Sequence, residues 1–461
     1  MGTPCLGILV GGGPAPGING VISAAAIEAI NSGMRVIGLY DGLRWLAGKE
    51  FDVAHHTIEL TIPLVARVHF DGGSILRTSR TSLLDDKKLK TSTVVAADPE
   101  KVKRVMARLE LLGITHLLTI GGDDTALSAR ITAEASRGKI RVVHCPKTID
   151  NDLPLPGDLP TFGYNTARHH GAILVKNLMQ DSKTTDRWYI VVAMGRNAGF
   201  LALGIGKSAG ATLTLIPEEF RDKVTVAQVC DVIEGAILKR RAMGRHDGVA
   251  VLAEGLAYRF GDRVELERIL GCEVPVDAAG HPRLAEFPLQ DVIRKELVRR
   301  FRDRGDKTTI VSGTLGYELR CAEPTPFDMA YCRDLGHGAI RMLLDTEANY
   351  PLGVMVTLQG GHLKPMFFEE MVDPQTNRTR VRQVDISSDS YRVARAYMLR
   401  LNKRDFESPE FVQKMAGHAK LSEAEFRKRF FPVVDGTICL DPPAEGPQPF
   451  LNLLRNGQTE P

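Results

Sequence analysis

The stretch HLLTIGGDDTAL, His116 to Leu127, sets a short apolar run directly before two glycines and two adjacent carboxylates. A five-residue apolar run that ends at glycine is typical of a strand buried on both faces. The residues after the glycines have the pattern of a helix. A strand that turns through glycines into a helix is the repeating unit of open parallel sheets.

Short apolar runs alternate with helical patterns along the rest of the chain. One intervening helix is well marked, because Asp98 can cap it, Pro99 suits its first turn and Gly113 can end it. The sequence therefore predicts an α/β fold with open, mostly parallel sheets flanked by helices. The predicted strands are Leu6–Val10, Arg35–Leu39, His116–Ile120, Arg141–Cys145, Trp188–Ala193, Thr212–Ile216, Gly248–Ala253, Thr308–Ser312 and Val354–Leu358.

Length and composition narrow the class of protein. A chain of 461 residues exceeds what one hydrophobic core usually serves, so two domains are expected. The net charge of +3 argues against a general binder of nucleic acid or membrane surfaces, and no apolar run is long enough to span a membrane. Seven cysteines without a CxxC pair indicate reduced thiols in a cytoplasmic protein. The tail from about Asp441 is expected to be poorly structured.

Polar groups follow the predicted strands, at the edge where parallel sheets bind ligands. After Leu6–Val10 comes GGGPAPGIN, whose backbone N–H groups can cradle a phosphate. The loop matches the Walker spacing, but Ile18 and Asn19 stand where Lys and Ser or Thr belong. A tight strand-to-helix turn with no ligand therefore remains an alternative.

Two further strand ends carry carboxylates. Asp123 in the GGDD turn suits Mg²⁺, a hard cation that prefers oxygen ligands, although an Asp there can also simply cap the next helix. In PKTIDND, Lys147 can bind phosphate, and Asp150 and Asp152 point the same way if the segment is extended. Each carboxylate then raises the pKa of the other, which helps one act as a base. A solvated acidic turn is the alternative.

Arginines complete the pattern. Arg196 follows Met194 and Gly195 at one strand end, and Arg320 follows Tyr317 at another. Arginine binds phosphate through two N–H groups, although each arginine alone is as well explained by an ordinary ion pair. The adjacent pairs His55-His56 and His169-His170 are interpreted as structural, because neighbours do not share a helix face.

GGxxPGxN, GGDD, PKTIDND, MGR, PE and LGYxxR, in this order, resemble the motifs of the phosphofructokinase family from about Gly7 to about Phe406. The resemblance implies two α/β domains with the active site in the cleft between them. Residues 1–165 with about 314–405 are then expected to form the domain that binds the phosphoryl donor. Residues 166–313 would bind the sugar phosphate, and 406–461 would be an extension of unknown role.

The resemblance also implies roles for single residues. Gly12 and Arg80 would contact the donor, Asp123 would hold Mg²⁺, and Asp150 would take the proton from the C1 hydroxyl of fructose 6-phosphate. Arg187 matches an arginine that the family supplies across a subunit interface, so a homo-oligomer, dimer or tetramer, is expected. The residues expected at the sugar phosphate are Thr148, Asp150, Asp152, Arg187, Met194, Gly195, Arg196, Glu218, Tyr317 and Arg320.

Asp124 and Lys147 bear on the donor. Family members that use ATP typically have glycine at both positions, and members that use pyrophosphate have Asp and Lys. A carboxylate at Asp124 would repel the α-phosphate of ATP by about 4 kcal/mol at 4 Å and an effective dielectric of 20. The resemblance thus implies reversible phosphoryl transfer from pyrophosphate to fructose 6-phosphate, with an ATP-dependent 6-phosphofructokinase as the alternative.

Two other functions are less consistent with the motifs. A lipid or NAD kinase also uses a GGDGT turn, but it would lack the TIDND and MGR segments that stand here. A catalytically silent nucleotide-sensing subunit would be expected to have lost Asp123, Asp150 or Arg196, and all three are present.

Overall fold

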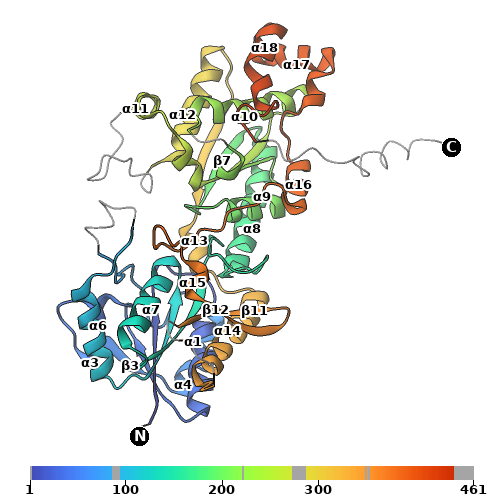
Figure 1. Cartoon of the computed structure of the whole chain (residues 1–461). Coiled ribbons are helices and arrows are strands. Elements are labelled where there is room, and N and C mark those ends of the chain that lie inside the picture. The colour runs from blue at the N-terminus through green and yellow to red at the C-terminus, as the bar shows by residue number, and fades with distance from the viewer. Residues whose placement is uncertain are drawn as a thin grey trace, which may run out of the picture.

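The computed structural model describes residues 3–85, 94–220, 223–271, 287–347, 350 and 353–440. Helices and strands gather around two separate sheets, one in the lower and one in the upper half of the view (Figure 1). The tail from Asp441, predicted above to be poorly structured, lies outside the described residues. Among the described helices, none has both the length and the apolar character that a membrane span requires.

The larger sheet is built mainly from the N-terminal part of the chain, in the order β12-β11-β5-β4-β1-β2-β3, with β6 paired to β5. Its inner strands are parallel, and β3 and β12 add antiparallel edges. The strands are β1 (Cys5–Val10), β2 (Arg35–Leu39), β3 (Thr57–Glu59), β4 (His116–Gly121), β5 (Arg141–Thr148), β6 (Phe162–Gly163), β11 (Val354–Gln359) and β12 (His362–Phe367).

Helices cover both faces of this sheet. Helices α1 (Ile18–Asn31) and α14 (Pro326–Leu344) bury their apolar residues in a core on one face. Helices α6 (Pro99–Leu111) and α7 (Asp123–Ser136) contribute to the core on the other face. The sheet is therefore buried on both sides, which explains why its strands are continuous apolar runs.

The smaller sheet has four parallel strands in the order β10-β7-β9-β8. These are β7 (Trp188–Ala193), β8 (Leu213–Leu215), β9 (Gly248–Ala253) and β10 (Ile310–Leu315). Helices α10 (Val226–Ala242) and α12 (Leu289–Asp303) pack on one face. Helices α8 (Tyr164–Thr185) and α9 (Phe200–Ala209) pack on the other.

The C-terminal helices belong to this second body. Helices α17 (Pro409–Ala419) and α18 (Glu423–Phe430) bury Val412, Phe426 and Phe430 in the same core as α10 and α12. Helix α16 (Asp389–Ala396) packs into the core of the opposite face, where Tyr391 is 1% exposed. The described residues after Phe406, 407–440, to which no role was assigned from sequence, thus contribute to the core of the second sheet.

All nine predicted strands are present, with ends shifted by at most three residues, and the α/β prediction is confirmed. The sequence pattern missed β3, β6 and β12, which are short or carry too many polar residues to give an apolar run. The remaining short elements are α2 (Arg44–Ala47), α3 (Val53–His56), α4 (Ile62–Val65), α11 (Arg263–Leu270), α13 (Tyr317–Arg320), α15 (Phe368–Met371) and the 3-10 turns Val68–Phe70, Pro217–Glu219, Glu254–Arg259, Lys403–Phe406 and Phe431–Val433.

The structure has the helix cap that was predicted for Asp98 at the start of α6, and its contribution to stability can be measured. The Asp98 side chain accepts hydrogen bonds from the backbone N–H groups of Glu100 and Lys101 at 2.9 and 3.1 Å. We expect Asp98→Ala to lower the free energy of unfolding by about 1 kcal/mol, whereas Asp98→Asn should retain the cap and the stability. Urea unfolding of both variants checks this, and equal stability of the Ala and Asn variants would contradict it.

Candidate active site

Strand ends from both sheets meet at one cavity of about 440 Å³. One part is lined by the turns that follow β1 and β4, by the end of β5 with the turn after it, and by Arg80 and Thr81. The turns after β7, β9 and β10 line the rest. The predicted site residues that line this cavity are Gly12, Arg80, Asp123, Asp124, Lys147, Thr148, Asp150, Asp152, Met194, Arg196, Tyr317 and Arg320. Residues separated by up to 308 positions in the chain are thereby brought together.

The GGDD turn presents its two carboxylates without using either as a helix cap. Gly122 occupies the cap position of α7, and Asp123 and Asp124 lie in its first turn, where the helix dipole favours negative charge. No side chain caps this helix, so the alternative that Asp123 merely serves as a cap is not observed. Gly121 is required here, because a Cβ atom would come within 2.3 Å of the Thr125 side chain.

The glycine-rich loop after β1 touches side chains from distant motifs. Gly12 has φ of +80°, and a Cβ atom on Gly13 would come 2.1 Å from a guanidinium nitrogen of Arg320. The Lys147 ammonium donates a hydrogen bond to the carbonyl oxygen of Gly13. Glycine therefore allows the loop to lie against two cations, which leaves the cavity side of the loop suited to an anion.

The TIDND segment places two carboxylates in the cavity through a turn. Burial raises the pKa of Asp150 to about 7, with the nearby Asp152 charge as the second cause. Burial and the charge of Asp123 raise the pKa of Asp152 to about 6. The segment is not extended as predicted, because Asn151 between them has a left-handed backbone with φ of +58°. Both carboxylates line the cavity nonetheless.

Four cationic side chains line the same cavity, namely Arg80, Lys147, Arg196 and Arg320. Burial, followed by the charge of Arg320, lowers the pKa of Lys147 to about 8, so its amine still carries a proton at neutral pH. Burial also lowers the pKa of Arg320, and the nearby Arg80 charge adds to this effect. Crowded, partly dehydrated cations of this kind are stabilised by a bound anion. The cavity thus combines an anion site with buried carboxylates of raised pKa.

Comparison with known proteins identifies the family to which this site belongs. The family model described as phosphofructokinase matches residues 5–343. The chain belongs to the phosphofructokinase family. It is 53% identical, over 92% of its length and 98% of the relative's, to the pyrophosphate–fructose 6-phosphate 1-phosphotransferase of Thermotoga maritima. The protein of the same name from Naegleria fowleri is 48% identical over 93% of this chain and 95% of its own.

Solved structures agree on the fold of this phosphofructokinase. The crystal structure of a pyrophosphate-dependent phosphofructokinase from Nitrosospira multiformis matches with a TM-score of 0.61 at 14% identity. The match covers 86% of this chain and 91% of that one. The predicted family and α/β architecture are both confirmed.

Glu254 and Tyr258 are among the cavity residues of this phosphofructokinase that the sequence analysis did not predict. Glu254 follows β9 directly and lines the cavity, where its carboxylate accepts a hydrogen bond from the backbone N–H of Gly195 at 3.3 Å. Burial raises the pKa of Glu254, and the charge of Arg196 opposes this. Tyr258 lines the same part of the cavity. The rule that strand ends carry the site, applied to Gly248–Ala253, would have found Glu254.

Three residues expected at the sugar phosphate do not line the cavity. Gly195 lies between two lining residues and contributes its backbone N–H to Glu254. Glu218 is 7% exposed and borders a different cavity of about 560 Å³. Its carboxylate accepts hydrogen bonds from the backbone N–H groups of Gly199 and Val384 at 2.9 and 3.0 Å. Arg187 precedes β7 and therefore lies at the end of the strand opposite the cavity.

The residues of the site fit a metal ion that is bound jointly with substrate. Within the described part of the chain, no three His, Cys, Asp or Glu side chains form a cage for a metal ion. Mg²⁺ usually binds through one or two carboxylates and substrate phosphates rather than such a cage. Asp123, in the cavity and near the Asp124 and Asp152 charges, supplies a carboxylate of that kind.

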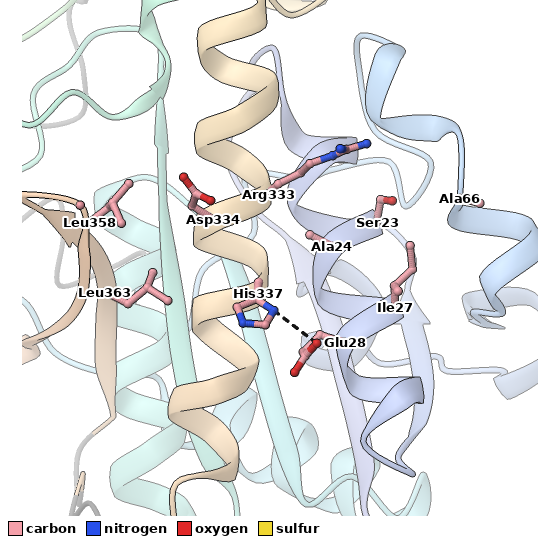
Figure 2. A pocket seen from close by; sticks show the side chains of 11 residues that line it. Ser23, Ala24, Ile27, Glu28, Ala66, Arg333, Asp334, His337, Leu358 and Leu363 are labelled. Atoms are coloured by element: carbon pink, nitrogen blue, oxygen red, sulfur yellow. Dashed lines mark ion pairs between the residues drawn. The ribbon is translucent and has the colours of Figure 1, made fainter.

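A third cavity, of about 510 Å³, lies between α1 and α14 on the larger sheet (Figure 2). The His337 side chain points toward Glu28, and Nδ1 of His337 lies 3.2 Å from a Glu28 carboxylate oxygen. None of the residues predicted for the active site lines it.

Proposed function

We propose that this phosphofructokinase transfers a phosphoryl group from pyrophosphate to the C1 hydroxyl of fructose 6-phosphate. The products are fructose 1,6-bisphosphate and phosphate. The observation that carries this proposal is that Asp124 and Lys147 line the same cavity as Asp123 and Asp150. The names of the relatives with 53% and 48% identity support the same function.

The choice of donor follows from charge. The Asp124 carboxylate lies at the cavity wall beside Asp123, where a longer donor would have to place a further phosphate. Burial and the Asp123 charge raise its pKa to about 6, so it is mostly ionised above that pH and repels such a phosphate. Pyrophosphate ends before this position, and Lys147 supplies a cation to the short donor. This favours pyrophosphate over the alternative, an ATP-dependent 6-phosphofructokinase.

The acceptor chemistry is assigned to Asp150. With a pKa raised to about 7, its carboxylate is basic enough to take the proton of the C1 hydroxyl at neutral pH. We assign Thr148, Asp152, Met194, Gly195, Arg196, Tyr317 and Arg320 to hold the sugar phosphate in line with the donor. Glu254 joins them as an acceptor for sugar hydroxyls, since it faces the cavity beside Arg196. Glu218 acts from outside the cavity, through the backbone segments it binds.

Donor binding is assigned to Gly12, Arg80 and Lys147. Asp123 is the residue that would hold Mg²⁺, and the ion, when bound, offsets negative charge on the transferring phosphoryl group. Lys147 and Arg80 neutralise the rest of that charge. Because pyrophosphate and a phosphate monoester are similar leaving groups, the reaction is expected to run in both directions, in glycolysis and gluconeogenesis.

We also propose how the two ligands divide between the bodies of the chain, how subunits assemble, and where in the cell the protein lies. We assign the donor to the body formed by residues 1–165 with about 314–405, apart from α16, which packs on the smaller sheet, and the sugar phosphate mainly to residues 166–313. Arg187, remote from the cavity of its own chain, would serve the site of a neighbouring subunit in a dimer or tetramer. A cytoplasmic location fits the predicted reduced thiols, of which Cys145, Cys230 and Cys332 are buried.

A donor-swap assay tests the function. With fructose 6-phosphate and Mg²⁺, we expect turnover with pyrophosphate and little or none with ATP at equal concentration, read as fructose 1,6-bisphosphate formed. Run in reverse, fructose 1,6-bisphosphate and phosphate should yield pyrophosphate. Turnover with ATP alone would overturn the proposal in favour of the alternative.

The pH profile provides a second test. Asp150 must be ionised to accept a proton, so kcat in the forward direction should fall as pH drops through about 7. Because the Asp152 charge contributes to that raised pKa, Asp152→Asn should move the acidic limb to lower pH. Asp334→Asn, an exposed aspartate on α14 that does not line the active-site cavity, is the control. An unmoved limb in Asp152→Asn would contradict the assignment of Asp150.

A further inference from the structure

An irregular segment near the C-terminal end of the larger body crosses three of the motif segments. This strap, residues 373–386, runs between α15 and α16. The Thr379 hydroxyl donates a hydrogen bond to the carbonyl oxygen of Asp123 at 3.4 Å. The backbone N–H of Arg382 donates a hydrogen bond to the carbonyl oxygen of Asp152 at 2.8 Å. Further on, the backbone N–H of Val384 donates to the Glu218 carboxylate at 3.0 Å. The strap thus contacts the GGDD and TIDND turns of one sheet and the PEE turn of the other.

All three nitrogen atoms of the Arg382 guanidinium donate hydrogen bonds to the loop between Asn151 and Leu159. Nε and Nη2 donate to the carbonyl oxygen of Asn151 at 3.3 and 3.1 Å, and Nη2 also donates to the side-chain oxygen of Asn151 at 2.6 Å. Nη1 donates to the carbonyl oxygens of Gly157 and Leu159 at 3.3 and 2.9 Å. The five N–H groups of an arginine are thereby matched by five hydrogen bonds. The guanidinium also lies 5.2 Å from the centre of the Phe200 ring.

Asn151, the main partner, is the residue on which the geometry of the two carboxylates depends. Its backbone is left-handed, a conformation that costs free energy for any residue with a side chain and that asparagine tolerates best. Asn151 is 6% exposed, and its side-chain oxygen also accepts from the backbone N–H of Thr161 at 3.0 Å. Asp150 and Asp152 flank it directly. A change of φ at Asn151 would rotate both carboxylates relative to the cavity.

We propose that Arg382 is a positioning residue for phosphoryl transfer. It holds Asn151 in its left-handed conformation, so that Asp150 and Asp152 stay directed into the cavity. This inference rests on the proposed function, since it takes Asp150 as the base. Arg382 does not line the cavity, so it acts through the turn rather than on substrate.

A positioning residue and a residue that only stabilises the fold affect different kinetic constants when they are removed. Misplacing a catalytic group by about 1 Å can cost a hundredfold in rate, while binding groups elsewhere in the site are untouched. Loss of Arg382 should therefore lower kcat by a larger factor than it raises the KM for fructose 6-phosphate, which Asp152 helps to hold, and should leave the KM for pyrophosphate nearly unchanged. It should also alter the acidic limb of the pH profile, because the raised pKa of Asp150 depends on burial and on Asp152.

The test compares Arg382→Ala and Arg382→Lys with Arg380→Ala. Arg380 is an exposed arginine two residues earlier in the same strap, and its backbone N–H bonds to Met371. We expect Arg382→Ala to lose about tenfold to a hundredfold in kcat. Arg382→Lys, which keeps the charge but not the planar fork, should lose nearly as much. Guanidinium ion at millimolar concentration should restore part of the activity to Arg382→Ala and none to Arg380→Ala.

Hydrogen–deuterium exchange of the same variants measures how well the backbone of the turn is held, independently of catalytic activity. Peptides covering residues 149–160 should exchange faster in Arg382→Ala and Arg382→Lys than in the wild type, and Arg380→Ala should match the wild type. Unchanged kcat in both Arg382 variants, or slowed turnover with unchanged exchange at 149–160, would overturn the proposal. If the wild type fails to turn over pyrophosphate, the proposed function fails, while exchange still reports whether Arg382 holds the turn.

Discussion

Asp150→Asn is expected to reduce kcat by about 10²–10⁴-fold, the range that general acid–base catalysis contributes. The substitution keeps the size of the side chain and removes its ability to take a proton. Fructose 6-phosphate should still bind, because the cations of the site, including Arg196 and Arg320, are intact. Steady-state kinetics in both directions, with isothermal titration of fructose 6-phosphate, measures the two effects separately.

A neighbouring carboxylate complicates this experiment in a defined way. Asp152 also has a raised pKa, of about 6, and lines the same cavity. Asp150→Asn/Asp152→Asn should therefore abolish any residual activity that depends on Asp152. Asp334→Asn, an exposed aspartate on α14 that does not line the active-site cavity, should retain the wild-type rate. A kcat in Asp150→Asn within tenfold of the wild type would exclude Asp150 as the base.

The second large effect is expected from Asp124→Gly/Lys147→Gly. Removing the Asp124 charge removes a repulsion of about 4 kcal/mol against a donor phosphate 4 Å away at an effective dielectric of 20. That corresponds to roughly a thousandfold in affinity, so the KM for ATP should fall by up to that factor. The kcat/KM for pyrophosphate should fall, because the Lys147 cation is lost. Kinetics with each donor at saturating fructose 6-phosphate checks both changes.

The single variants separate the two causes. Asp124→Gly alone should admit ATP while retaining most of the pyrophosphate activity that depends on Lys147. Lys147→Gly alone should lose pyrophosphate activity without gaining ATP activity, since the Asp124 carboxylate remains. No gain of ATP affinity in either variant that lacks Asp124 would contradict the charge argument. In the wild type, discrimination against ATP should weaken below pH 6, where Asp124 becomes protonated.

The sequence predicted the strands and the turns after them because both depend on local patterns. Buried parallel strands are apolar runs, and the groups that follow them must gather at one edge of the sheet. That rule brought Asp123, Asp150 and Arg196 into one cavity. The same rule applies to Glu254, which follows the inner strand β9 directly.

Other features of the site could not be predicted from the neighbouring sequence. Arg382 bonds to Asn151 across 231 positions, and its segment has neither helical nor strand periodicity. Glu218 follows a strand as the rule requires, but its carboxylate turns toward the backbone of Gly199 and Val384. The direction of a side chain at a strand end depends on the segments that pack against it, and a sequence pattern contains no information about those segments.

The C-terminal helices have a consequence for synthesis on the ribosome. The larger sheet acquires β11 only after Val354, and the core around α10 includes side chains as late as Ile438 and Cys439. Motif residues that emerge early must therefore wait for distant partners, because Gly12 shares its cavity with Arg320, 308 positions later, and Asp123 accepts a hydrogen bond from Thr379, 256 positions later. A nascent chain halted before residue 400 lacks α17 and α18 and should have no catalytic activity.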